Sequence, residues 1–456
     1  MPVRNALAML VCGLWWWSVA AAAAQPAAQR IVGAHANGAA WIIEMPAAWN
    51  GTVLLYSHGY SPVLSTAPPD SAPRETRAWL LSHGYALAAS SFTAGGWALA
   101  EAPVDQLQVL DQFVQRFGQP RRTIAWGSSM GGLVTLALAE RQPQRVHAAL
   151  SLCGSVSGSL GMLNTALDGA FAFRTLLAPD SDIRIVGVDD DRANGARVQS
   201  VLQAAWATPA GRARVVLAAA LAQLPSWSDS TQPQPSAKDF EAQAEQLRRT
   251  FAMGVFVPRV DQERRAGGIY GWNAGVNYRR LLAQSPLRSL VRHVYAQAQL
   301  DLDADLAQLD AAPRIEARAD AVAYMRANFV PRGDWQVPVL TLQTIGDGLT
   351  VPATHGGLQQ LTRAAGAQRM LGQLWVERAG HCTFTAPELV SALLTLERRL
   401  DSGRWSLQPE AVAARGMSAG EAARFISYRT PRMPRQCGAR AGSCTGEPVP
   451  AGPAPP

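Results

Sequence analysis

Three widely spaced residues have side chains that could act together in nucleophilic catalysis. Ser129 is the central residue of GSSMG at 127–131, a match to the pattern G-x-S-x-G. A serine hydroxyl is a weak nucleophile, and it needs a general base that an acidic residue orients. His381 and Asp347 are the candidates for the base and the acid. The chemistry of such a trio is acyl transfer through a covalent intermediate.

The serine motif lies between a short apolar run and a helical run. Residues 124–126 are typical of a buried strand, and an Ala/Leu-rich helix follows and stops near Pro143. The turn between them would hold Ser129 in a strained conformation, and glycines at 127 and 131 remove Cβ atoms that would collide with the strand and the helix. A glycine-rich turn with a capping serine is the alternative, because five-residue patterns also occur by chance.

Asp347 and His381 each lie just beyond the end of an expected strand. The strand 337–344 runs into a tight turn that contains Asp347, and the strand 373–377 runs into a turn that contains His381. Taken singly, a turn-forming aspartate or a surface histidine is the commoner explanation. Together, at three strand ends and in the order Ser, Asp, His, chance is a poor explanation.

The elements around these residues alternate between strands and helices. Further strands are expected at 40–45, 52–57, 86–90 and 148–153, and helices at 75–82, 103–117, 353–365 and 386–400. This alternation predicts an α/β fold with a mostly parallel sheet flanked by helices on both faces. Asn50-Gly51 lies between the first two strands and predicts that they pair as a hairpin.

From about residue 155 to 335 the alternation stops and helical patterns dominate, at 197–206, 211–224, 237–251 and 314–329. An insertion of this length predicts a cap over the site, with an independent second domain as the alternative. The expected division is a core of 25–155 and 336–402, a helical cap of 156–335 and a C-terminal extension of 403–456. In the extension we expect a helix at 419–428 and a disordered, proline-rich tail from 446.

Large aromatic residues in the insertion admit two interpretations: they could line an acyl pocket, or they could form the core of the cap, which is the commoner role. They are Phe171, Phe173, Trp206, Trp227, Phe251, Phe256 and Trp272.

The N-terminus has the features of a secretory signal peptide. A short positive region at 1–4 precedes an apolar run at 6–20, and Ala22-Ala23-Ala24 fits cleavage before Gln25. A retained anchor is disfavoured because the run is short, and the residues before Cys12 do not fit a lipoprotein site. No later run reaches the roughly 18 apolar residues of a spanning helix. We expect a secreted or periplasmic protein without a stable membrane span.

Five cysteines are present, and removal of Cys12 with the leader leaves four. An even number in an oxidising compartment favours disulfides. Cys437 and Cys444 are close enough in sequence to pair locally, and a bridge between Cys153 and Cys382 would brace the site beside His381. Four cysteines allow three connectivities, and free thiols at Cys153 and Cys382 are the alternative.

Charge and motifs restrict the classes of partner. The formal charge of +7 comes from scattered arginines, without the basic stripe of a nucleic-acid-binding protein. Acidic runs at 189–191 and 301–305 lack the spacing of a calcium loop and are interpreted as solvated surface. No nucleotide-binding or metal motif is found, so we expect no cofactor. The sequence leaves the oligomeric state open.

With these motifs, the chain resembles the α/β-hydrolase superfamily of serine esterases, lipases and peptidases over about 40–155 and 337–400. The resemblance implies that Ser129 is the nucleophile, His381 the general base and Asp347 its orienting acid. It also implies an oxyanion hole formed by the backbone N–H groups of Met130 and Tyr60. Residues 58–60 read His-Gly-Tyr instead of the HGGG of some lipases, which makes the second donor less well defined.

The expected activity is hydrolysis of a small-molecule or oligomeric carboxylic ester. An exo- or oligopeptidase is the main alternative, because the same triad also cleaves amides. A catalytically silent binding protein on a hydrolase scaffold is the third, and the intact trio argues against it.

Overall fold

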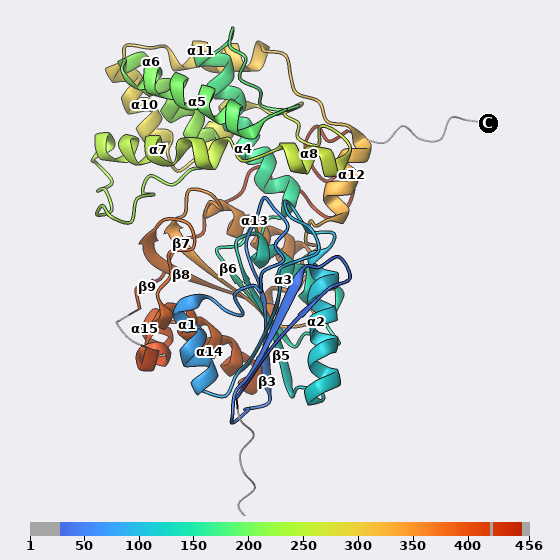
Figure 1. Ribbon diagram of the computed structural model, residues 1–456. Helices are drawn as coiled ribbons and strands as arrows, with labels where there is room; N and C mark the ends of the chain where they lie inside the picture. Colours follow the sequence, from blue (N-terminus) through green and yellow to red (C-terminus); the bar gives the residue numbers. More distant parts are fainter. Residues whose placement is uncertain (1–27, 420–422, 449–456) are drawn as a thin grey trace, which may run out of the picture.

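In the computed structural model, which describes residues 28–419 and 423–448, the centre of the fold is a single sheet (Figure 1). The sheet has the order β1-β2-β4-β3-β5-β6-β7-β8-β9. All pairs from β4 to β8 are parallel, and the outer pairs β1/β2, β2/β4 and β8/β9 are antiparallel. The strands are Gln29–Ala34, Ala40–Met45, Thr52–Ser57, Ala86–Ser90, Arg122–Ser128, Ala148–Leu152, Val339–Gly346, Leu371–Ala379 and Phe425–Ile426 for β1 to β9. The predicted mostly parallel sheet is confirmed.

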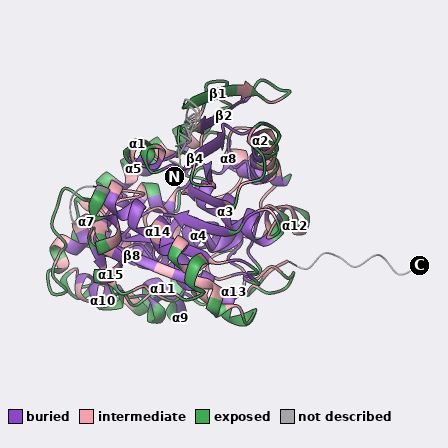
Figure 2. Cartoon of the chain, turned by 90° about the horizontal axis from the view of Figure 1, so that it is seen from below, coloured by how far each residue is buried: buried purple, intermediate pink, exposed green. Residues whose placement is uncertain are grey.

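Helices cover both faces of the sheet. The helices α1 (Arg74–Ser82) and α14 (Ala386–Ser402) lie on one face, and α2 (Ala102–Phe117), α3 (Met130–Arg141) and α13 (Ala353–Ala364) lie on the other (Figure 1). The central strands are buried throughout while β1 at the edge is largely exposed (Figure 2). This burial on both faces explains why the central strands are continuous apolar runs in the sequence.

The predicted hairpin between the first two strands is wrong. Strand β4 lies between β2 and β3, antiparallel to the first and parallel to the second. The Asn50-Gly51 turn does form, but the Asn50 amide donates to the carbonyl of His83 and its backbone N–H to that of Gly84. The turn is therefore tied to the loop before β4, and that strand takes the place between its neighbours.

Nine helices of the described chain lie between β6 and β7 and form a layer beyond the carboxyl ends of the strands (Figure 1). They are α4 (Gly158–Leu177), α5 (Asp191–Trp206), α6 (Pro209–Leu221), α7 (Phe240–Val255), α8 (Val260–Ala266), α9 (Tyr278–Gln284), α10 (Arg288–Gln297), α11 (Leu302–Ala311) and α12 (Ala319–Ala327). The sequence did not predict α4, which is buried along most of its length because helices surround it. A Cβ on Gly169 would lie 2.7 Å from the Cβ of Ala222, so α4 and the end of α6 pack closely.

Most of the large aromatic residues of the insertion form its core. Phe173 packs against Phe251 and Phe256, with ring centroids 5.2 and 5.5 Å away. Phe171 and Trp272 are also buried. The core interpretation of these aromatic residues therefore accounts for their positions. Among the described residues, no helix has both the length and the apolar character needed to cross a bilayer.

The described part of the extension continues from α14 through α15 (Pro409–Ala413) and a 3-10 turn (Ala414–Ala419) to β9. The predicted helix at 419–428 is wrong at Phe425–Ile426, which pair with β8 as strand β9. Residues 423–448, which we call the strap, then cross from the sheet edge to the insertion. The predicted signal peptide at 1–24 lies outside the described residues, as does most of the predicted disordered tail.

Candidate active site

Ser129 lies in a tight turn between β5 and α3. Its backbone has φ 58° and ψ −121°, a conformation that L residues rarely adopt. A Cβ on Gly127 would lie 2.5 Å from the carbonyl oxygen of Gly131, and one on Gly131 would lie 2.0 Å from that of Ser57. No side chain fits at these distances, so both glycines of the pattern are sterically required. The turn places Ser129 directly after the carboxyl end of β5, at the N-cap of α3.

The structure brings the three candidate side chains together from three strand ends. Nε2 of His381 lies 2.9 Å from Oγ of Ser129, and Nδ1 lies 2.8 Å from Oδ2 of Asp347. With Nδ1–H donating to the carboxylate, the lone pair of Nε2 faces the serine hydroxyl. This is the geometry in which an imidazole can accept the serine proton.

The acid is fixed by its own turn. Asp347 is fully buried, and its Oδ1 accepts hydrogen bonds from the backbone N–H groups of Leu349 and Thr350 at 2.9 and 3.0 Å. Oγ1 of Thr350 lies 2.8 Å from Oδ2 of Asp347. The sequence analysis did not identify Thr350, although a threonine three residues after an aspartate in a tight turn is a signal for such a contact.

The neighbourhood of His381 affects its protonation. Burial disfavours the imidazolium, but the charge of Asp347 and the hydrogen bond to it outweigh burial and raise the pKa of His381 above its usual value. The positive charge that His381 would acquire on taking the serine proton is therefore stabilised by Asp347.

The loop after β3 passes directly over the serine. A Cβ on Gly59 would lie 3.3 Å from the Cβ of Ser129. Within the described chain, the backbone N–H groups of Tyr60 and Met130 donate to no other protein group. Met130 is the first residue of α3, so its N–H is one of the unpaired donors of a helix N-terminus. The two groups remain the predicted oxyanion donors.

The other histidines have structural partners. The ring of His58 stacks on Phe92 with centroids 4.1 Å apart, and burial lowers the pKa of His58 below its usual value. His355 is fully buried, its Nδ1 lies 3.0 Å from Oγ1 of Thr341, and burial lowers its pKa to about 3. Neither lies in a hydrogen bond with the serine or the acid.

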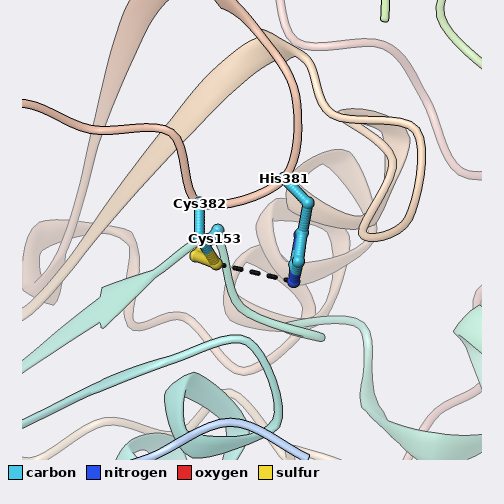
Figure 3. A group of neighbouring side chains, drawn as sticks. All are labelled: Cys153, His381 and Cys382. Carbon is cyan, nitrogen blue, oxygen red and sulfur yellow. Dashed lines mark hydrogen bonds between the residues drawn. A yellow bond between two sulfur atoms is a disulfide. The ribbon is translucent and has the colours of Figure 1, made fainter.

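Two disulfides connect four of the five cysteines. Cys153 pairs with Cys382, and Cys437 pairs with Cys444, with Cα atoms 5.3 and 5.0 Å apart. The first bridge lies beside His381, and Figure 3 shows both sulfur atoms next to the imidazole. Because these sulfur atoms are bonded to each other, they are not available as thiolate ligands for a metal.

The acidic runs serve local structure. Asp190 caps α5 through the N–H groups of residues 192 and 193, and Asp301 caps α11 in the same way. Asp191 accepts from the backbone N–H of Arg259, and Asp305 pairs with Arg214. These contacts explain the carboxylates without a bound ion.

Comparisons with known proteins agree with this architecture. A family model described as alpha/beta hydrolase fold matches residues 59–182, which contain the serine turn. The o-phthalyl amidase of Xanthobacter agilis is 31% identical over 432 residues, which are 87% of this chain and 93% of that protein.

Two solved structures show weaker likeness. The acylaminoacyl peptidase of Pyrococcus horikoshii is 11% identical with a TM-score of 0.39, over 85% of this chain and 43% of that one. Lipase A of Candida antarctica is 14% identical with a TM-score of 0.38, over 81% of this chain and 75% of that one. The assignment rests on the family model and the amidase, and on these grounds the chain belongs to the α/β-hydrolase family.

Proposed function

We propose that the protein is a serine hydrolase that cleaves a carboxylic acyl bond through an acyl-enzyme. The observation that carries the proposal is the continuous contact from Ser129 through His381 to Asp347, at 2.9 and 2.8 Å. A buried acid that accepts hydrogen bonds from the backbone N–H groups of Leu349 and Thr350 holds the imidazole in one orientation and tautomer, which is the role of the acid in a triad.

In the first half-reaction, Oγ of Ser129 attacks the carbonyl carbon while Nε2 of His381 takes the hydroxyl proton. The N–H groups of Met130 and Tyr60 donate to the oxyanion that forms. The tetrahedral intermediate collapses, the bond to the leaving group breaks, and the leaving group takes the proton from His381. Water, deprotonated by His381, then attacks the acyl group, and Ser129 regains its proton as the acid is released.

The first candidate for the bond is a carboxylic ester. An alkoxide or phenolate is a better leaving group than an amide nitrogen, so a triad of this kind needs less help from the site to cleave an ester. Amide hydrolysis is the second candidate, because the amidase relative matches over nearly its whole length. A peptidase is a special case of the second candidate that would also need recognition of a peptide backbone.

A substrate panel distinguishes these candidates. The mature protein and its Ser129→Ala variant would be assayed on p-nitrophenyl esters, on N-aroyl and N-acyl p-nitroanilides, and on aminoacyl p-nitroanilides. Ester turnover that is lost in the variant supports the first candidate. A kcat/KM for acyl anilides equal to or above that for matched esters supports the second. Absence of turnover, together with no labelling by a fluorophosphonate, would refute a serine hydrolase and favour a silent scaffold.

We also propose that the protein is exported. The signal-like N-terminus and the two disulfides support this, since disulfides persist in oxidising compartments. Fractionation of the producing cells and N-terminal sequencing test it. A mature chain that begins at Gln25 in the periplasm or medium is expected, and an uncleaved cytoplasmic chain would contradict the proposal.

A further inference from the structure

The disulfide between Cys153 and Cys382 joins two segments that also hold the candidate triad. Cys382 directly follows His381, and its Sγ lies 3.5 Å from Nε2 of His381 (Figure 3). Cys153 follows β6, the strand that neighbours both the serine strand and the acid strand. Its own backbone N–H donates to the carbonyl of Leu342 in β7. The bridge thus links the base-bearing turn to the middle of the sheet.

Both half-cystines have unusual backbone conformations. The φ of Cys153 is 43° and that of Cys382 is 57°, in the left-handed region that favours glycine. Such conformations persist only where the surroundings hold them, and they concentrate at functional sites. A covalent link between the two residues is the strongest available constraint on both.

A hydroxyl connects the same bridge to the acid. Oγ1 of Thr350 lies 2.9 Å from the carbonyl oxygen of Cys153 and 2.8 Å from Oδ2 of Asp347. The hydroxyl has one proton, so it links these two acceptors by sharing that proton between them in a bifurcated hydrogen bond. The carboxylate in turn holds Nδ1 of His381. The path from His381 through the disulfide to Cys153, through Thr350 to Asp347 and back to His381 is therefore a closed ring.

We propose that the Cys153–Cys382 disulfide is a positioning element of the base and the acid, and that the Thr350 hydroxyl is its link to the acid. This inference rests on the proposed serine-hydrolase function. The disulfide restrains the turn that carries the imidazole, and the Thr350 hydroxyl restrains the carboxylate that holds Nδ1 of His381. Because both belong to one ring, removal of either should release the same restraint on the imidazole. Misplacement of a catalytic group by about 1 Å can cost on the order of 100-fold in rate, so the effect should fall on kcat and leave KM nearly unchanged.

A double-mutant cycle tests the ring. One variant, Cys153→Ala/Cys382→Ala, removes the bridge, Thr350→Val removes the hydroxyl at equal size, and a third combines them. We expect each of the first two to lower ester kcat by about 10-fold or more, and the combined variant to be about as slow as the slower of the two, because the changes act on one network. Thr350→Ser should restore most of the kcat lost in Thr350→Val.

The second disulfide provides the matched control. Cys437→Ala/Cys444→Ala removes a bridge from the strap, and we expect a lower melting temperature with kcat within about 2-fold of the unaltered protein. In this background Cys153–Cys382 is the one remaining disulfide of the mature chain. A dithiol reagent would exchange with it, leaving two cysteine thiols and the oxidised, cyclic reagent. Loss of kcat on reduction and recovery on reoxidation would support the proposal even if the cysteine-to-alanine variant does not fold.

Several results would overturn the inference. Multiplied losses of kcat in the combined variant would mean that the bridge and the hydroxyl act independently. Unchanged kcat after reduction, with both thiols verified by alkylation and mass spectrometry, would make the bridge purely structural. Failure of the proposed function looks different, because then the unaltered protein would show no Ser129-dependent turnover at all.

Discussion

The end of the core that carries the proposed triad and the contact between the insertion and the strap both contain buried polar side chains, but these side chains are held in different ways. At the proposed active site, Ser129, Asp347 and His381 each follow a strand, and local turns bring their side chains into contact. Between the insertion and the strap, Asp168 lies inside helix α4 and Arg435 in a turn of the strap, so their buried pair depends on how the helix and the strap pack together.

We expect the first region to determine the rate of the reaction and the second to determine the stability of the fold. The contacts of the proposed triad would orient reacting groups, and the buried strap contacts join the strap to the insertion. Arg435 also donates to the carbonyl of Trp272, and a second buried pair joins Arg326 to Glu447. Changes at the first region should alter rate with little effect on folding, and changes at the second should do the reverse.

The largest expected effect is the loss of the nucleophile. Ser129→Ala should lower kcat by on the order of 10⁴-fold or more without changing the melting temperature appreciably, because members of a triad act as a unit. The matched control is Ser128→Ala, since Ser128 lies next in the chain and its Oγ accepts a hydrogen bond from Tyr56 at 3.2 Å. Comparable losses in both variants would point to distortion of the turn.

The second effect concerns stability. Arg435→Met leaves Asp168 buried without its charge partner, and removal of one partner of a buried pair should lower the free energy of unfolding by about 3 kcal/mol at pH 8. Burial raises the pKa of Asp168 to about 6, with Arg435 opposing the shift. At pH 5 the carboxyl is mostly neutral, so the loss should be smaller there.

Chemical denaturation at the two pH values measures this difference. Arg440→Met is the control, because Arg440 is an exposed residue of the same strap. An equal loss for Arg435→Met at pH 5 and pH 8 would mean that ionisation of Asp168 is not involved.

A smaller effect is expected at an acidic run in the insertion. Asp301 caps α11, so Asp301→Ala should lower the free energy of unfolding by about 1 kcal/mol, and Asp301→Asn by much less, because asparagine caps equally well. Thermal unfolding with and without calcium measures both variants. A melting temperature that rises with calcium and loses this rise in Asp301→Asn would contradict the capping role.

The last prediction is a shift in pH dependence. His381 must be neutral to accept the serine proton, and its pKa is raised by Asp347 against the effect of burial. Activity should therefore rise with pH through a midpoint above about 6.5, the usual value for histidine. The contact of the imidazolium with Asp347 stabilises the fold fully at pH values below about 6.5, the pKa of an unfolded histidine. This stabilisation is lost as the pH rises through the raised pKa of His381. A midpoint of kcat/KM at or below 6.5 would contradict this.

The sequence predicts the turns of Ser129, Asp347 and His381 better than it predicts the contacts between the insertion and the strap. The strand before Ser129, the glycines around it, and the turns that contain Asp347 and His381 are local patterns, and their places in the sheet follow from the chain order. The family and the mostly parallel sheet were predicted on this basis. The bridges Cys153–Cys382 and Cys437–Cys444 together make up one of the three connectivities that the sequence allows.

What the sequence did not predict depends on long-range packing. Helix α4 lacks a polar face because other helices surround it, so it has no amphipathic pattern to detect. The position of β4 between β2 and β3 depends on pairing that a local turn signal does not encode. Phe425–Ile426 became a strand because the edge of β8 was available to it. The role of Thr350 requires knowing that Cys153 lies against the acid turn.

The most direct test of the central claim is the site of covalent labelling. The protein would be treated with a fluorophosphonate and digested, and the adduct located by peptide mass spectrometry. The account predicts a single adduct on Ser129 that is nearly absent in His381→Ala, because the hydroxyl is then no longer activated. An adduct on another residue, or labelling of Ser129 at an undiminished rate in His381→Ala, would contradict it.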